Sequence, residues 1–203
     1  MSQISALRLL ILLIGVPGSG KSSLAQQLQQ TGYSLVSTDQ IRAALFGRES
    51  VQGDWSLIGQ AVEQKLRAAF PCPTVYDATN SRRSARRAVI RLARQIGYDQ
   101  IVGLWLNPPL TLCLDRNQQR LRQVPEPVIR RMYQQLRSSP PRLSEGLDLL
   151  LHYGSALDLG SAKDSLSRKI LLSLQAKKPE AKNLGQSTAI APIAQQKPNR
   201  TER

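Results

Sequence analysis

The sequence predicts an α/β fold in which a doubly wound parallel sheet of about five strands is flanked by helices. The apolar run Leu9–Ile14 is followed by a glycine-rich turn and then by a helical segment over 21–30. Short strand-like runs then alternate with longer helical segments along the chain. The carboxyl ends of such strands meet at one edge of the sheet, where proteins of this class bind ligands.

Glycine and proline residues set the boundaries of the expected elements. Gly32, Gly47 and Gly97 follow helical segments, and glycine readily takes the left-handed conformation that ends a helix. Pro71 breaks the third helix because proline lacks a backbone N–H, and Pro108 opens a later one. The expected strands cover 9–14, 33–37, 74–76, 100–106 and 147–152, and the expected helices cover 21–30, 38–46, 55–70, 81–96, 108–120 and 128–137.

The turn after the first strand fits G-x-x-x-x-G-K-[ST], the phosphate-binding P-loop. Its residues are Gly15, Val16, Pro17, Gly18, Ser19, Gly20, Lys21 and Ser22, with Ser23 next in the helix. Backbone N–H groups and the helix N-terminus favour phosphate here. Lys21 is expected to reach the β- and γ-phosphates, and Ser22 to bind Mg²⁺. The motif predicts a P-loop NTPase fold that binds ATP with Mg²⁺.

Composition limits the other classes of function. Of the 203 residues 41% are hydrophobic, enough for one core, and the net charge of +14 favours a polyanionic partner. Cys72 and Cys113 form no CxxC pattern, so we expect a reducing compartment and no disulfide framework. His152 is the only histidine, and nothing near it supports a histidine-based zinc or hydrolase site.

The chain is expected to form one domain over 1–160 and a basic, disordered tail over 161–203. Nine basic and three acidic residues fall in the tail, where apolar runs are short from Ala176 onward. The apolar run at the N-terminus is too short to cross a bilayer, and no cleavage site for a signal peptide follows it. We therefore expect a cytoplasmic protein that has no membrane partner.

Asp39 and Arg42 lie three residues apart at the start of a helix, so their side chains share one face. The helix begins at the carboxyl end of the second strand, beside the expected P-loop. There Asp39 can accept the proton of an attacking hydroxyl, and Arg42 can hold that carboxylate or a phosphate. The alternative is that Thr38 or Asp39 only caps the helix and that Arg42 is a surface residue.

Asp77, Thr79 and Asn80 follow the third expected strand. A carboxylate at this position either organises Mg²⁺ or binds hydroxyl groups of a substrate. The alternative is that Asn80 or Ser81 caps the next helix, and capping and function can coexist.

The helix over 81–96 carries an arginine stripe with no acidic residue between its members. A helical wheel puts its arginines on one half and its apolar residues on the other. Arginine makes forked contacts with phosphate, so we expect nucleic acid to contact Arg83 and Arg87, whereas a solvated basic face is the alternative. The stripe consists of Arg82, Arg83, Arg86, Arg87, Arg91 and Arg94.

A helical lid is expected near Arg116 and Arg120, which are four residues apart and should project together. Arg122 lies just beyond, before the break at 123–127. Arginines of a lid close on the transferring phosphate and stabilise its developing charge. The alternative is a basic helix end favoured by the helix dipole.

Taken together, these segments resemble the kinase domain of phage-type polynucleotide kinases, within the wider group of small P-loop kinases that includes zeta-toxin-like proteins. The resemblance extends over about residues 8–140. The segments that match are 15–22, 38–42, 77–80 with the arginine-rich helix after it, 115–120, 124–125 and 132–133.

The resemblance implies an ATP-dependent kinase domain over 1–160 that phosphorylates a 5′-hydroxyl of single-stranded DNA or RNA. It implies that Asp39 is the general base, that Arg42 orients it, and that Lys21 and Arg120 hold the donor phosphates with Arg116 nearby. Asp77 would organise the acceptor side. The segment between Phe46 and Phe70 does not match closely, so a small-molecule, nucleotide-sugar or tRNA-linked acceptor stays open, as does an ATP-binding RNA module without transfer.

Overall fold

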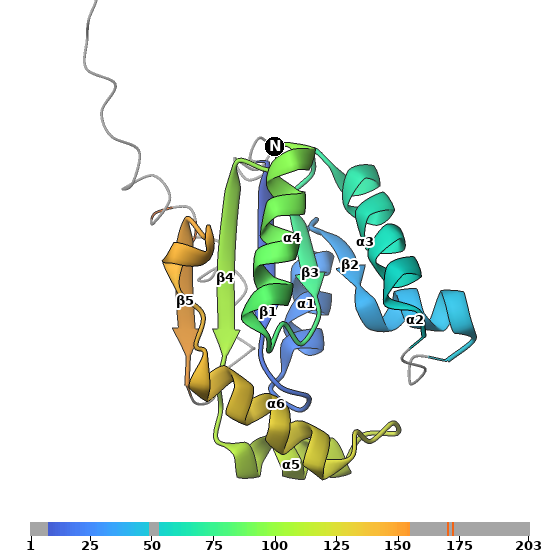
Figure 1. The fold of residues 1–203 in the computed structure, drawn as a ribbon, viewed down its shortest axis with the longest axis vertical. Coiled ribbons are helices and arrows are strands. Elements are labelled where there is room, and N and C mark those ends of the chain that lie inside the picture. The colour runs from blue at the N-terminus through green and yellow to red at the C-terminus, as the bar shows by residue number, and fades with distance from the viewer. Residues whose placement is uncertain (1–7, 49–52, 155–169, 171, 173–203) are drawn as a thin grey trace, which may run out of the picture.

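The computed structural model describes residues 8–48, 53–154, 170 and 172 of the chain (Figure 1). In this part, a five-stranded parallel sheet has the strand order β2-β3-β1-β4-β5. The strands are β1 (Leu9–Ile14), β2 (Ser34–Ser37), β3 (Thr74–Asp77), β4 (Gln100–Leu106) and β5 (Leu149–Tyr153). The helices are α1 (Lys21–Gln30), α2 (Thr38–Phe46), α3 (Trp55–Ala69), α4 (Arg83–Ile96), α5 (Leu110–Gln118) and α6 (Glu126–Ser138), with a 3-10 turn η2 (Leu143–Glu145). The predicted fold class is confirmed.

The sheet is covered on both faces, which explains why β1 is apolar along its whole length. Every residue of β1 is fully buried. Leu10, Leu12 and Ile14 pack in the core that α3 and α4 cover, whereas Leu9 and Ile11 pack on the opposite side with α1. Figure 1 shows α4 in front of the sheet and α1 behind it. A strand with helices on both sides has no face on which polar residues could alternate.

The carboxyl ends of the strands point toward α5 and α6, which lie across that edge of the sheet (Figure 1). The loop after β3 is tied to β1 by two hydrogen bonds. The N–H of Gly15 donates to the carbonyl oxygen of Thr79 at 3.1 Å, and the Asn80 side-chain amide donates to the carbonyl of Leu13 at 2.7 Å. Asn80 itself has a left-handed backbone, with φ of 52°. These bonds fix the loop after β3 relative to the end of β1 and the loop that follows it.

The expected C-terminal tail over 161–203 lies almost entirely outside the described residues. Ile170, which falls within it, is buried in the core on the α1 side of the sheet, so this position packs with the domain. Among the described residues, none of the helices combines the length and the apolar character needed to cross a membrane.

Arg86 corrects the predicted arginine stripe, because its side chain is fully buried and does not belong to the exposed face. Its Nε and Nη2 donate to the two carboxylate oxygens of Glu145 at 2.6 and 2.7 Å. Its other bonds run to backbone carbonyls of Asn80, Ser81 and Ser139, at 3.0 to 3.2 Å. Arg86 therefore joins the loop after β3 to η2 and to the end of α6.

Arg94 also has a structural contact, because its Nη2 lies 2.6 Å from a carboxylate oxygen of Asp148. A helical wheel groups residues by type and angle, and it cannot show which arginines meet a carboxylate from a distant part of the chain.

We expect Arg86→Met to lower the free energy of unfolding by about 3 kcal/mol, because the buried Glu145 carboxylate loses its partner. Urea denaturation would measure this change. The exposed neighbour Arg87 offers a control, since Arg87→Met should change stability by less than about 0.5 kcal/mol. The double variant Arg86→Met/Glu145→Leu should recover part of the loss. A single variant as stable as the control would contradict the structural role of Arg86.

Candidate active site

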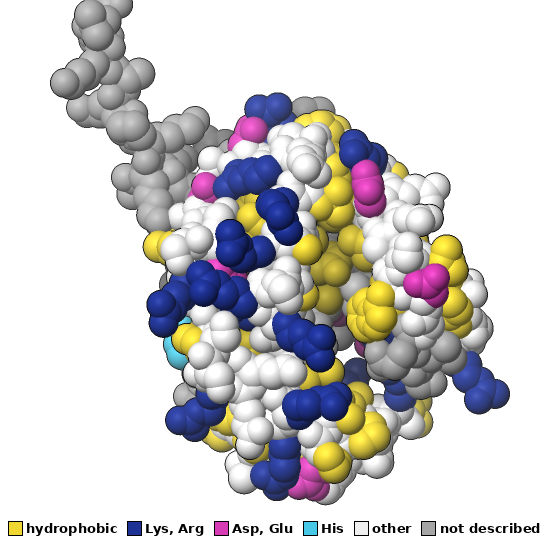
Figure 2. Space-filling model, in the orientation of Figure 1, with side chains coloured by type: hydrophobic (Ala, Val, Ile, Leu, Met, Phe, Trp, Pro, Cys, Tyr) yellow, Lys and Arg dark blue, Asp and Glu magenta, His cyan; other side chains and the backbone are white. Residues whose placement is uncertain are grey.

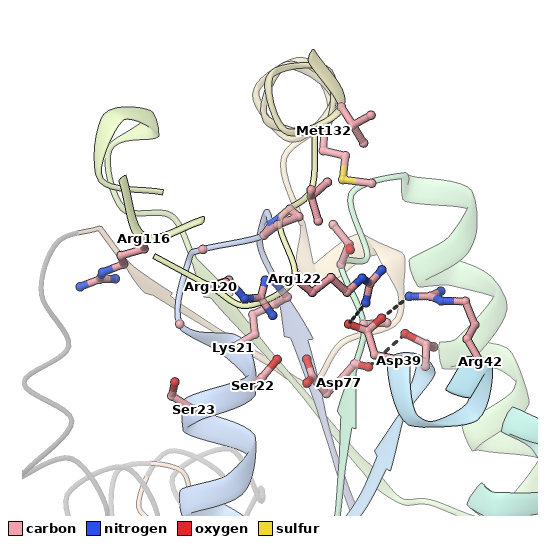
Figure 3. A pocket seen from close by; sticks show the side chains of 18 of the residues that line it. Lys21, Ser22, Ser23, Asp39, Arg42, Asp77, Arg116, Arg120, Arg122 and Met132 are labelled. Carbon is pink, nitrogen blue, oxygen red and sulfur yellow. Dashed lines mark hydrogen bonds and ion pairs between the residues drawn. The ribbon is translucent and has the colours of Figure 1, made fainter. Parts of the chain in front are cut away.

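A pocket of about 350 Å³ opens where the P-loop, the carboxyl ends of β2 and β3, and the segment from α5 to α6 come together (Figure 3). Its floor is formed by the P-loop and the start of α1. Its walls carry one group of charged and polar side chains and one apolar patch. The lining residues are Pro17, Gly18, Gly20, Lys21, Ser22, Ser23, Thr38, Asp39, Arg42, Asp77, Ala78, Thr79, Arg116, Gln119, Arg120, Arg122, Val124, Val128 and Met132.

The P-loop curls tightly beneath α5, and Gly18 shows why glycine is needed there. Gly18 has a φ of +80°, and a Cβ at this position would lie 2.1 Å from the carbonyl oxygen of Cys113 in α5. Any other residue would clash with backbone that has no room to move. Gly20, also with positive φ, then leads into α1. The helix N-terminus thus faces the pocket, as phosphate binding requires.

Lys21 is buried at the floor of the pocket. Its ammonium donates to the carbonyl of Val16 at 2.9 Å and to the Ser19 hydroxyl at 3.4 Å, so the loop itself holds the side chain. Burial lowers the pKa of Lys21 from its ordinary 10.5, while the nearby Asp77 and Asp39 oppose that shift. Phosphate oxygens entering the loop would supply the negative charge that favours the ammonium form.

Ser22 and Asp77 meet beside Lys21. Burial raises the pKa of Asp77, while the nearby Lys21 ammonium and the Ser22 hydroxyl oppose that rise. The Thr38 hydroxyl donates to the backbone carbonyl of Asp77 at 3.3 Å, which links the ends of β2 and β3. The serine hydroxyl and the carboxylate are both hard oxygen ligands.

This pair fits Mg²⁺. Within the described residues, no group of three or more His, Cys, Asp or Glu side chains is positioned to hold a metal ion. Mg²⁺ in kinases is held by one or two protein oxygens, together with water and the phosphates of the substrate. Ser22 and Asp77 would supply those protein oxygens, and the raised pKa of Asp77 marks a buried carboxylate that a cation would stabilise.

Asp39 lies across the pocket from the P-loop, and two arginines hold it. The guanidinium of Arg42, one turn along α2, is paired with one of its carboxylate oxygens. Arg122 reaches the other oxygen from the segment between α5 and α6, with 3.5 Å between Nη1 and Oδ2. Figure 3 shows both guanidinium groups pointing toward Asp39. Asp39 is not the cap of α2, because the Ser37 side chain caps this helix.

The two lid arginines of the prediction do not project together. The helix α5 ends at Gln118, so Arg120 lies beyond it. Arg120 lies near Lys21 in Figure 3, whereas the side chain of Arg116 points away from the pocket centre. The expected pairing assumed a helix that continued to residue 120. Spacing on a helix determines direction only where the helix is formed.

The structure brings most of the predicted site residues into one pocket. Lys21, Ser22, Asp39, Arg42, Asp77 and Thr79 all line it. Asn80 does not line it and instead bonds to β1, and Arg83 and Arg87 are exposed on α4 outside it. The roles assigned to all of these residues, inside and outside the pocket, stay predictions.

The contribution of Arg122 to the site was missed. It lies in a loop without periodicity, and its only sequence signal is its closeness to Arg116 and Arg120.

The sequence matches a family described as an AAA domain over residues 10–139. A curated relative, L-seryl-tRNA(Sec) kinase from Methanococcus maripaludis, is 28% identical over 138 residues, which cover 62% of this chain and 51% of the relative. The chain thus spans about half the length of that relative.

Solved structures of kinases share the fold. A gluconokinase from Sinorhizobium meliloti 1021 superposes with a TM-score of 0.56 at 21% identity, covering 84% of this chain and 93% of its own. Shikimate kinase from Acinetobacter baumannii gives a TM-score of 0.54 at 17% identity, covering 87% and 98%. The resemblance to P-loop kinases inferred from the motifs is therefore confirmed for the family and the fold. The chain belongs to the AAA domain family and has the fold of the small P-loop kinases.

Proposed function

We propose that this protein is an Mg²⁺-dependent kinase that transfers the γ-phosphate of ATP to a hydroxyl group. The observation that carries the proposal is the arrangement of Lys21, Ser22 and Asp77 on one side of a pocket and Asp39 on the other. One side suits a donor of phosphate, and the other suits the activation of an acceptor. The relative from Methanococcus maripaludis is itself a kinase by name.

On the donor side, positively charged groups held by the protein bind and stabilise the phosphates of ATP. The P-loop N–H groups and Lys21 hold the β- and γ-phosphates, and Arg120 approaches from the lid side. Ser22 and Asp77 would hold Mg²⁺, which would neutralise charge on the phosphate oxygens. The Lys21 ammonium stabilises the charge that develops on the transferring group, because it is held at a fixed place by Val16 and Ser19.

On the acceptor side, Asp39 takes the proton of the hydroxyl. As the acceptor oxygen forms its bond to the γ-phosphorus, the bond from that phosphorus to the β,γ-bridging oxygen breaks and ADP leaves. Arg42 and Arg122 keep the Asp39 carboxylate pointed at the pocket. A base that is held in place in this way loses little entropy when the reaction occurs.

We propose that the acceptor hydroxyl belongs to a nucleic acid or is linked to one. The net charge of +14 favours a polyanion. The 28% identical relative is named for a tRNA-linked substrate. A small-molecule acceptor is the second candidate, because Val124, Val128 and Met132 give the pocket an apolar wall of modest size.

A panel of acceptors tests the proposal. The protein is incubated with γ-labelled ATP, Mg²⁺ and one of these: 5′-hydroxyl RNA, 5′-hydroxyl DNA, aminoacylated tRNA, nucleosides, gluconate or shikimate. Label transferred to an RNA or DNA acceptor is the expected result. Transfer to a small acceptor alone would favour the second candidate, and no transfer to any acceptor would argue against a kinase of these classes.

We expect Asp77→Asn to raise the Mg²⁺ concentration needed for half-maximal activity by at least roughly 10–100-fold, because losing a group that only orients a metal ligand already has an effect of this size. Asn keeps the size of the side chain and removes its charge. Asp99→Asn is the control, since Asp99 pairs with Arg8 on an exposed surface. An unchanged Mg²⁺ requirement would assign Asp77 to the acceptor, as the resemblance to polynucleotide kinases suggested.

A further inference from the structure

Outside the pocket, exposed arginines from separate parts of the chain form one surface. Figure 2 shows Lys and Arg side chains gathered over α4 and along α6. We call this the α4–α6 arginine surface. Its members are Arg82, Arg83, Arg87, Arg91, Arg137 and Arg142, all exposed.

The folding of the chain brings Arg137 and Arg142 to the start of α4. Arg86 bonds to the carbonyl of Ser139 and to Glu145, so the end of α6 and η2 lie against α4. The Ser81 hydroxyl bonds to Gln135 of α6 at 2.9 Å. The sequence alone gave only the α4 part of this surface.

Little negative charge balances this surface. Among the described residues, Arg83 lies 3.8 Å from Glu145, and that carboxylate is already held by the buried Arg86. The first turn of α4 has no acidic residue and no side-chain cap. Positive side chains at the positive end of a helix repel one another and the dipole. An anion bound at this end would offset the electrostatic repulsion. It would also accept hydrogen bonds from the backbone N–H groups of the first turn of the helix.

The surface adjoins the pocket along two segments. In the loop after β3, Ala78 and Thr79 line the pocket, and Arg82 follows three residues later. In α6, Met132 lines the pocket and Arg137 follows five residues later. A polymer with its acceptor end in the pocket can therefore lie across the arginines.

We infer that the α4–α6 arginine surface binds the phosphate backbone of a double-helical RNA stem that carries the acceptor. This inference rests on the proposed nucleic-acid acceptor, and the choice of RNA rests on the 28% identical relative, which is named for a tRNA-linked substrate. Arg83, Arg87 and Arg91 recur every four residues, about 6 Å apart along one line of α4, which suits successive phosphates. The exposed aromatic residue in the described chain, Trp55, belongs to α3 and not to this surface. Single strands are usually bound by stacking on aromatic side chains, so the surface fits a paired helix better.

The test compares binding by two variants that lose the same charge. Arg83→Gln/Arg87→Gln/Arg91→Gln removes three charges from the surface. Arg48→Gln/Lys65→Gln/Arg67→Gln removes three exposed charges, one just after α2 and two from α3. Fluorescence anisotropy measures Kd for a labelled RNA hairpin with a phosphorylated 5′ end, without ATP, over a range of salt concentrations. Single-stranded RNA and a DNA duplex are measured in the same way, and cosedimentation measures binding to anionic vesicles. Because no transfer takes place, the result does not depend on kinase activity.

The surface variant should raise Kd for the hairpin at least about tenfold and reduce the slope of log K against log salt by about two to three units, since each duplex phosphate contact contributes roughly 0.9. The control variant should bind nearly as wild type. Equal losses in both variants would show that only net charge matters and overturn the inference. It would also be overturned by a loss confined to single-stranded RNA or to anionic vesicles. A DNA duplex bound as tightly as the RNA would contradict the choice of RNA.

If transfer to every acceptor failed while the hairpin result held, the kinase proposal would fall and the RNA surface would stand. If transfer to an RNA acceptor succeeded and the surface variant still bound the hairpin as wild type, the kinase proposal would stand and the RNA surface would fall.

Discussion

Lys21→Ala is expected to abolish phosphoryl transfer, with a fall in rate of at least about a thousandfold, equivalent to about 4 kcal/mol in the barrier. The physical reason is the position of the ammonium, which the loop holds through Val16 and Ser19 at the site of the donor phosphates. ATP binding should weaken sharply as well. Single-turnover transfer from γ-labelled ATP and calorimetric ATP binding would measure the two effects.

Two further variants separate charge from packing. Lys21→Met keeps the stem of this buried side chain and should be as inactive as Lys21→Ala. Lys65→Ala, on the exposed side of α3, should keep normal activity. A Lys21→Met variant with near-normal turnover would contradict the assignment of the P-loop as the donor site.

Lys21 also predicts a dependence of binding on pH. In the protein without ATP, burial holds the pKa of Lys21 below the ordinary lysine value of 10.5. Phosphates bound in the loop should raise that pKa again. At alkaline pH below 10.5, part of the free protein therefore lacks this proton, and ATP binding should take a proton up. Calorimetry in two buffers of different ionisation enthalpy would detect the uptake in the wild type, and Lys21→Met should lack it.

Much of the fold and the donor side could be predicted because their signals are local. A fully apolar β1, a glycine-rich turn and Lys21 at the start of α1 lie within a few residues of one another. Asp39 and Asp77 could be predicted as well, because parallel strands bring their carboxyl ends to one edge. The alternation of strands and helices is enough to predict this arrangement, and no specific contact between two distant side chains has to be known.

The parts that could not be predicted depend on partners far away in the chain. Arg86 was assigned to an exposed stripe, but Glu145, 59 residues later, draws it into the core. Arg122 reaches Asp39 across 83 residues. Such pairs form only because the folded chain brings them together, and neither periodicity nor residue type marks them. The arginine surface gains Arg137 and Arg142 for the same reason.

Asp39→Asn is expected to leave ATP binding intact and to slow transfer to the acceptor by roughly 10²–10⁴-fold, the usual contribution of a general base. Asn keeps the size of the side chain, and the Ser37 cap of α2 does not depend on it, so the fold should be unaffected. The kcat for transfer should fall while Kd for ATP stays constant. Normal turnover by this variant would show that Asp39 is not the base.

The two arginines around Asp39 sharpen this test. If Arg122 acts by holding the Asp39 carboxylate, Arg122→Gln should slow transfer in the wild type but have little further effect in Asp39→Asn, because the group that it orients is already lost. Arg130→Gln, which removes a charge paired with Glu126 on the exposed side of α6, is the matched control. Independent, multiplicative losses for Asp39 and Arg122 would mean that Arg122 acts on the phosphates instead, as a lid arginine does.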